Sequence, residues 1–207
     1  MKGAIFDLDG VIVDTAKYHF YAWRELANEL GFEFTAKDNE RQKGVSRMQS
    51  LEVLLEVGGI TRLSDQEKEN LASKKNARYI EMLDRLDKSE LLEGAEAYLK
   101  KLRSEGVRIS LGSASKNAPF ILEKLGITDL FDAIVDGNDV AKAKPAPDVF
   151  LRAAEVLGLD PADCCVFEDS QAGIDAARAA GCSVIAIDIN GVLTGADKNV
   201  KTLAEML

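Results

Sequence analysis

Cysteine and histidine are scarce in this chain of 207 residues, which contains three cysteines and one histidine. The cysteines, Cys164, Cys165 and Cys182, are odd in number, and no spacing typical of a metal centre joins them to His19. We therefore expect reduced thiols in the core rather than a redox or metal site. Reduced thiols are typical of the cytoplasm, where we expect the protein to act.

Long apolar runs and excess positive charge are also missing. No run approaches the roughly 20 apolar residues that a membrane-spanning helix needs, and the chain opens directly on an apolar strand, so we expect no signal peptide. The net charge is −9. An acidic surface repels nucleic-acid phosphates and anionic membranes, so neither is an expected partner. A small phosphorylated substrate remains compatible with this charge if cations gather in a pocket.

Short apolar runs alternate with amphipathic helical stretches along most of the chain. The runs are rich in Val, Ile and Phe and lie at 3–6, 107–111, 133–135, 164–167 and 184–187. Between them, apolar residues recur every three or four positions over 94–105, 119–125, 147–157 and 171–180. This alternation predicts an α/β fold, a Rossmann-like, doubly wound parallel sheet with helices on both faces.

One long stretch contains no strand candidate. From about residue 16 to residue 86, apolar residues recur at helical spacing through 18–30, 46–57 and 65–83, and glycines separate these segments. We therefore expect an all-helical cap domain over residues 16–86, inserted after the first strand. The core domain is then discontinuous and consists of residues 1–15 and 87–207.

Acidic pairs follow the first and the fourth predicted strand, at the edge where doubly wound sheets bind ligands. Asp7 and Asp9 follow the first strand, and Gly10 permits a tight turn that lets both carboxylates face one cleft. Such a pair suits one acid as nucleophile and the other as proton donor. Glu168 and Asp169 follow the fourth strand and can supply oxygen ligands for a hard cation. Taken singly, each pair is more often a solvated or capped turn.

A hydroxyl and a lysine follow the two strands in between. Ser113 opens a helix, where it can cap the helix and hold an anion on free backbone N–H groups. Lys144 lies in a segment stiffened by Pro145 and Pro147, and it can clamp a phosphate or a carboxylate. A plain helix cap and a solvated lysine are the common roles of such residues alone. The argument for chemistry therefore rests on the order of acid pair, hydroxyl, lysine and acid pair.

In that order, the four strand ends resemble those of the haloacid dehalogenase-like superfamily of phosphotransferases, and the resemblance covers the whole chain. It implies an enzyme with Asp7 as the covalent nucleophile and Asp9 as the general acid and base. It also implies that Ser113 binds the transferring phosphoryl group and that Lys144 steadies it. The implied cofactor is Mg²⁺, held by Asp7, the backbone carbonyl of Asp9, Glu168 and Asp169.

The cap carries further motifs that resemble the sugar-phosphate mutases of this superfamily. Arg47 would grip the phosphate that is not reacting, and residues 43–46 would form the loop that reads the sugar. The implied substrate-binding residues are His19, Trp23, Lys43, Gly44, Val45, Ser46, Arg47, Lys75, Asn76, Ala114, Ser115, Lys116 and Asn117. By the plainer interpretation, Arg47 and the cap lysines are solvated helix charges, and His19 is structural.

The resemblance implies interconversion of β-D-glucose 1-phosphate and β-D-glucose 6-phosphate through phospho-Asp7. The activating intermediate would be β-glucose 1,6-bisphosphate. A sugar-phosphate phosphatase is the alternative, because it would share the core residues and let water attack phospho-Asp7. A non-catalytic phosphosugar-binding protein on the same fold is a remoter one. A mutase needs a cap that closes against water, and we expect a monomer because the cap must move freely.

Overall fold

A computed structural model describes residues 1–42, 45–84 and 86–207. Within these residues, six strands form one parallel sheet in the order β3-β2-β1-β4-β5-β6. From β1 the chain adds β2 and β3 on one side, and it then returns to add β4, β5 and β6 on the other side. The direction of strand addition therefore reverses between β1 and β4, and doubly wound sheets bind ligands at such a point. The strands are β1 (Gly3–Phe6), β2 (Arg108–Gly112), β3 (Ala133–Val135), β4 (Cys164–Glu168), β5 (Ser183–Ile187) and β6 (Lys198–Val200).

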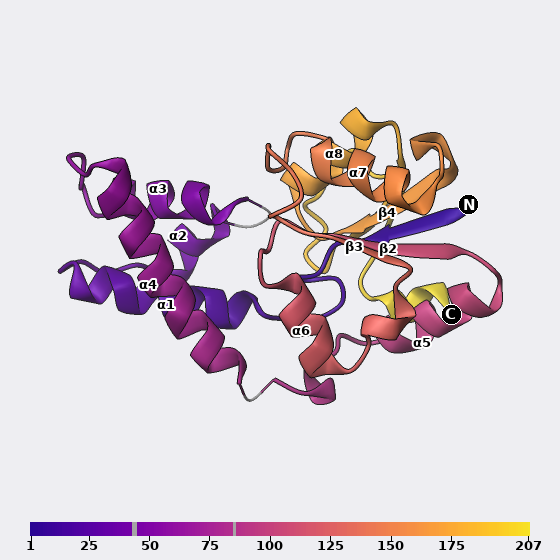
Figure 1. The fold of residues 1–207 in the computed structure, drawn as a ribbon, viewed down its shortest axis with the longest axis horizontal. Coiled ribbons are helices and arrows are strands. Elements are labelled where there is room, and N and C mark those ends of the chain that lie inside the picture. The colour runs from indigo at the N-terminus through magenta and orange to yellow at the C-terminus, as the bar shows by residue number, and fades with distance from the viewer. Residues whose placement is uncertain (43–44, 85) are drawn as a thin grey trace.

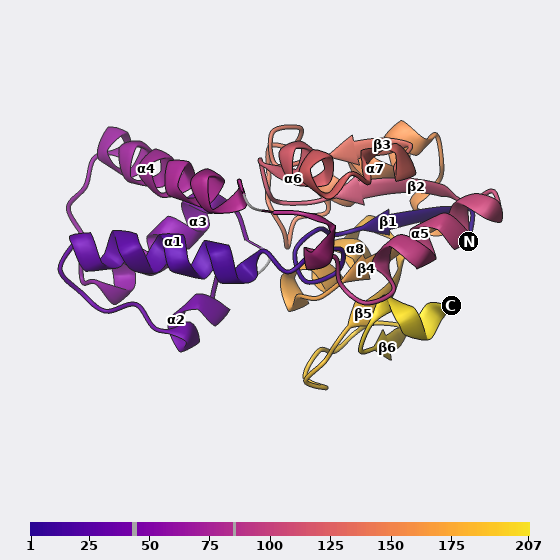
Figure 2. The same ribbon diagram turned by 90° about the horizontal axis from the view of Figure 1, so that it is seen from below.

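Helices cover both faces of the sheet, as predicted (Figures 1 and 2). One face packs against α5 (Ala95–Ser104) and α6 (Ala118–Leu125), and the other against α7 (Asp148–Leu157) and α8 (Gln171–Ala180). Cys164 and Cys165 belong to opposite faces, and all three cysteines are free and buried. Short 3-10 turns complete the core at η1 (Lys88–Glu90), η2 (Thr128–Leu130), η3 (Pro161–Asp163) and η4 (Leu203–Met206).

The insert after β1 is helical and has a small core of its own, which includes Trp23, Leu26, Leu51 and Leu54. Its helices are α1 (Ala16–Glu29), α2 (Ala36–Glu40), α3 (Arg47–Val57) and α4 (Asp65–Leu83). In Figure 1 it lies beyond the end of the sheet toward which β1 runs. The strand ends that carry the predicted site therefore face the insert.

Helix α2 and strand β6 were not predicted from the sequence, and neither were the short 3-10 turns. Helix α2 is five residues long, too short for a periodic apolar pattern, and the capping box between Thr35 and Asp38 defines its start. Strand β6 contributes one buried residue, Val200, at the sheet edge next to β5. No helix in the described part of the chain is long and apolar enough to cross a membrane.

Candidate active site

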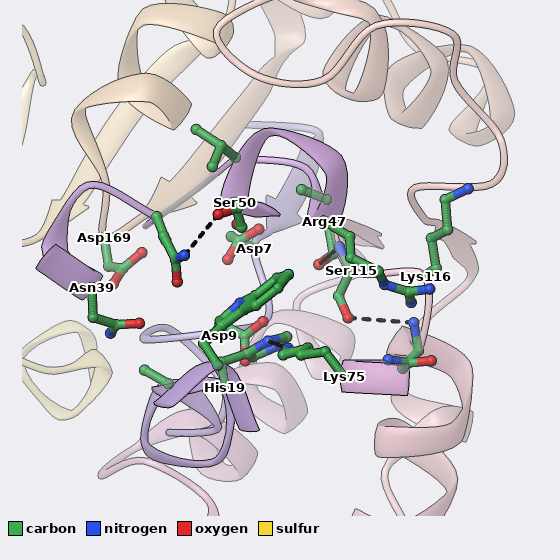
Figure 3. A pocket seen from close by; sticks show the side chains of 17 residues that line it. Asp7, Asp9, His19, Asn39, Arg47, Ser50, Lys75, Ser115, Lys116 and Asp169 are labelled. Carbon is green, nitrogen blue, oxygen red and sulfur yellow. Dashed lines mark hydrogen bonds between the residues drawn. The ribbon is translucent and has the colours of Figure 1, made fainter. Parts of the chain in front are cut away.

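One cavity lies between the strand ends of the core and the helices of the insert (Figure 3). Both sides contribute side chains, and most of the predicted site residues are among them. The lining residues are Asp7, Asp9, Ala16, His19, Trp23, Asn39, Gln42, Val45, Arg47, Ser50, Lys75, Ser113, Ala114, Ser115, Lys116, Asn117 and Asp169. The fold therefore brings the acids, the hydroxyl and several cations of the sequence motifs to one place.

Lys144 is not among the lining residues, but it ties two of the acids together. Its ammonium group donates to Asp7 Oδ1 at 2.6 Å and to Glu168 Oε1 at 2.5 Å. Lys144 is 1% exposed, and Asp7 and Glu168 are buried as well. Burial alone would lower the pKa of Lys144, but the two carboxylates outweigh it and raise the pKa above its usual value. Lys144 is therefore a permanent cation beside Asp7 and Glu168.

The two acids that follow β1 have different surroundings. Burial raises the pKa of Asp7 to about 6, and the charge of Lys144 opposes the rise. Burial, followed by the charge of Asp7, raises the pKa of Asp9 to about 8. Asp9 Oδ1 is also buried without a hydrogen-bond partner in the described residues. Asp9 is thus suited to carry a proton near neutral pH, while Asp7 is the better nucleophile.

The acids after β4 are packed against glycines. A Cβ atom at Gly10, whose φ is +81°, would lie 2.0 Å from Asp169 Oδ2, and one at Gly173 would lie 1.9 Å from Glu168 Cδ. Glu168 Oε2 accepts from the backbone N–H and the hydroxyl of Ser170, both at 2.8 Å, so both Glu168 oxygens have protein donors. Asp169 instead lines the cavity, and burial with the charges of Glu168 and Asp7 raises its pKa to about 8.

This surplus of carboxylates fits a hard divalent cation, whose charge would offset the cost of burying them. No group of three or more His, Cys, Asp or Glu side chains in residues 1–42, 45–84 and 86–207 is placed to hold a metal by side chains alone. Mg²⁺ does not require such a cage, because it keeps several waters and binds proteins through one or two carboxylates. Asp7 and Asp169 are the carboxylates at the cavity wall.

A second polar pair comes from the insert. Lys75 Nζ lies 2.7 Å from His19 Nδ1 and 4.7 Å from the ring centroids of both Trp23 and Tyr79. Burial and the charge of Arg47 lower the pKa of Lys75 to about 7, and burial with the charges of Lys75 and Arg47 lowers the pKa of His19. A neutral His19 accepts from the Lys75 ammonium group.

Arg47 and Lys116 lie on one side of the cavity and Asn39 and Asp169 on the other (Figure 3). No ion pair joins Arg47 to a carboxylate in the described residues, and burial lowers its pKa. At the same end, Asn117 Nδ2 donates to Asn76 Oδ1 at 2.9 Å, which links core and insert directly. This end of the cavity therefore presents positive charge that residues 1–42, 45–84 and 86–207 do not neutralise.

Some predicted residues have other surroundings. Ser46 caps α3 through a capping box with Gln49, and Asn76 contacts Asn117 at the edge of the cavity. Lys43 and Gly44, predicted for the sugar-reading loop, lie outside the described residues. Asn39, Gln42 and Ser50 line the cavity but were not predicted. For Ser50, helical spacing offered a signal, because it lies three residues after Arg47 on the same helix. Asn39 lies in α2 and Gln42 follows it, and this helix is too short to give such a signal.

The profile of the haloacid dehalogenase-like hydrolases matches residues 1–181. The chain belongs to this family and is one of its enzymes, as the strand-end motifs predicted. It is 44% identical over 207 residues to the β-phosphoglucomutase of Bacillus subtilis (strain 168), a match that spans all of this chain and 92% of that relative. It is also 34% identical to the fructose-1-phosphate phosphatase of Escherichia coli (strain K12), over 88% of this chain and 94% of that one.

Solved structures agree with the sequence relatives. The crystal structure of β-phosphoglucomutase from Clostridium difficile superimposes with a TM-score of 0.95 and 39% sequence identity, over all of this chain and 93% of that one. The resemblance to the sugar-phosphate mutases drawn from the cap motifs is therefore confirmed. Phosphotransferases of this family use Mg²⁺.

Proposed function

We propose that this protein is a β-phosphoglucomutase, which interconverts β-D-glucose 1-phosphate and β-D-glucose 6-phosphate. The observation that carries the proposal is Arg47, which has no carboxylate partner among the described residues, lies across the cavity from Asp169 and faces the same space as Asp7. A mutase must hold two phosphates at once, one at the nucleophile and one at a distance. A phosphatase needs only the first of these sites.

The chain's own groups supply a route for phosphoryl transfer. Lys144 holds Asp7 Oδ1, so Oδ2 is the oxygen that attacks phosphorus and forms the acyl phosphate, while the P–O bond to the sugar breaks. Protonated Asp9 gives its proton to the departing sugar oxygen. Ser113 Oγ accepts from the backbone N–H of Ser115 at 3.1 Å, which leaves the Ser113 hydroxyl proton free to donate to a phosphoryl oxygen.

The half-reaction that forms the bisphosphate starts from phospho-Asp7 and runs the same steps in reverse. The Asp9 carboxylate takes a proton from the accepting hydroxyl, whose oxygen attacks phospho-Asp7 and releases the carboxylate. The bisphosphate must then turn so that its other phosphate reaches Asp7. Arg47, with Ser115, Lys116 and Asn117, would hold the phosphate at the distal end. Trp23, Val45, Lys75 and Ala114 would line the sugar between the two ends.

Mg²⁺ is the cofactor that fits the donor set. Asp7, Asp169 and the backbone carbonyl of Asp9 would hold it directly, and we retain Glu168 in the site as the acid that fixes Lys144 and adds negative charge. When bound, the ion would neutralise charge on the phosphoryl oxygens and so let a carboxylate approach them. β-Glucose 1,6-bisphosphate would be needed to load Asp7 at the start.

The helical insert has a part in the chemistry, because it must exclude water from phospho-Asp7. We propose that residues 16–86 form the moving cap and residues 1–15 and 87–207 the core. The Asn76–Asn117 contact is one that the cap makes and breaks. The same freedom suits a monomer, and three reduced thiols suit the cytoplasm.

A product assay tests the proposal against the phosphatase alternative. Purified protein with Mg²⁺, β-glucose 1-phosphate and a trace of the bisphosphate should form glucose 6-phosphate much faster than free phosphate, when both are followed in parallel. Excess EDTA should silence both products, and added Mg²⁺ should restore them. Dominant release of free phosphate would make the protein a phosphatase, and absence of both products with every component present would favour the binding protein.

Replacing Arg47 by alanine should separate the two phosphate sites. We expect kcat/KM for the mutase reaction to fall about 100-fold, because a charge-assisted contact to the distal phosphate is lost. Hydrolysis of a small phosphate monoester, which has no distal phosphate, should change by less than about threefold. The matched control is Arg62→Ala, an exposed arginine of the insert away from the cavity. Equal losses in both reactions would contradict a distal clamp.

A further inference from the structure

Gln42 presents an unused acceptor at the cavity wall. The residue is 9% exposed and lines the cavity, and its Nε2 donates to the backbone carbonyl of Ser50 at 2.8 Å. Its other polar atom, Oε1, is buried and has no hydrogen-bond partner among the described residues. Oε1 is one of three such side-chain atoms there, with Asp9 Oδ1 and Arg78 Nη1. Two of the three thus belong to residues that line this cavity.

The orientation of the amide is fixed by its neighbour. A carbonyl oxygen can only accept, so the group facing Ser50 must be the amide nitrogen of Gln42. Turning the amide over would place two acceptors against each other at Ser50 and would not satisfy Oε1. The unused oxygen is therefore a consistent property of the fold and does not depend on how the amide is assigned.

Burial of an acceptor without a partner opposes folding, and such groups are rare unless a ligand completes them. An apolar side chain of similar size would fill the same space at no such cost. Because Gln42 lines the cavity, a molecule bound there can supply the partner that the described residues do not provide. That partner must donate a proton, which a phosphate dianion cannot do and a sugar hydroxyl can.

We propose that Gln42 is a specificity-determining residue whose amide oxygen accepts a hydrogen bond from a ring hydroxyl of the sugar phosphate. The inference rests on the proposed function only in that it takes a phosphorylated sugar as the substrate. A phosphatase of the same substrate class would use Gln42 in the same way. A site built around a substrate hydroxyl discriminates strongly against the analogue that lacks it, so Gln42 would select among hexose phosphates.

The test compares β-glucose 1-phosphate with its 2-deoxy, 3-deoxy and 4-deoxy forms in the wild type and in Gln42→Leu and Gln42→Met. Sugar monophosphates and free phosphate are separated and quantified together, so kcat/KM is obtained for either product. In the wild type, kcat/KM for one of the deoxy sugars should be about tenfold lower than for the parent sugar. In both variants, kcat/KM for the parent sugar should be about tenfold lower than in the wild type. Each variant should then have the same kcat/KM for that deoxy sugar as for the parent sugar.

The control is Gln66→Leu, the same change at an exposed glutamine of α4 that pairs with Asn70, and it should keep the wild-type pattern. The proposal is overturned if the ratio of kcat/KM between each deoxy sugar and the parent sugar is the same in the wild type and in both variants. This holds even if the variants are less active on every sugar. Because the pattern can be scored on free phosphate as well, failure of the mutase assignment would leave this test intact. The use of two replacements of different shape separates loss of the acceptor from a packing defect.

Discussion

Asp7→Asn is expected to reduce turnover by at least about 10⁴-fold, because an amide cannot attack phosphorus as a carboxylate does. The change keeps the shape of the side chain, and Lys144 retains its contact with Glu168. Loss of activity should therefore come without loss of the fold, which circular dichroism and thermal unfolding would check. Brief exposure of the wild type to substrate should also yield a peptide phosphorylated on Asp7, and the variant should yield none.

Asp129→Asn is the matched control, since Asp129 is exposed on η2 and does not line the cavity. Its activity should stay within about twofold of the wild type, as expected for a surface change away from the site. Turnover by Asp7→Asn at more than a few per cent of the wild-type rate would remove Asp7 from the role of nucleophile. It would also remove the acyl phosphate from the mechanism.

Lys144→Met is expected to have the largest effect on stability, lowering the free energy of unfolding by about 3–5 kcal/mol. The ammonium group bridges Asp7 and Glu168, and all three side chains are buried. Without it, two carboxylates would share a water-poor space with no cation between them. Urea unfolding with EDTA present, so that no metal replaces the missing charge, measures the change.

Lys142→Met provides the comparison, because Lys142 is exposed two residues earlier in the same segment and its loss should cost less than about 0.5 kcal/mol. The double variant Asp7→Asn/Lys144→Met should recover part of the loss, since one of the two uncompensated charges is gone. Equal urea midpoints for Lys144→Met and Lys142→Met would contradict a structural role for the buried ammonium group.

The core of the site could be predicted because it follows from topology. Parallel strands end at one edge, so residues placed directly after strands, such as Asp7, Ser113 and Asp169, must meet there wherever they fall in the sequence. The strand limits of β1, β3 and β5 agree with the apolar runs to within a residue. The period of the pattern and the position of the polar residues were enough to place these side chains at one edge, whereas the roles expected of them came from the family resemblance.

The wall contributed by the insert was harder to predict because its geometry depends on how helices pack. His19 and Lys75 lie 56 positions apart, and their contact arises from the packing of α1 against α4. The role of Gln42 depends on a backbone carbonyl eight residues away. Ser46 shows the opposite case, since its place before α3 is explained by capping alone. Local pattern does not separate these situations, whereas the packed structure does.

Gly10 and Gly173 bear on how this site can change over evolutionary time. Each supplies no atom to the chemistry, yet a methyl group at either position would occupy the space of an acid, Asp169 in one case and Glu168 in the other. A substitution there would leave every acid in the sequence and still displace one of them from the proposed cation site. A relative that keeps all its acids but has lost one of these glycines should therefore be expected to bind phosphosugars without turning them over.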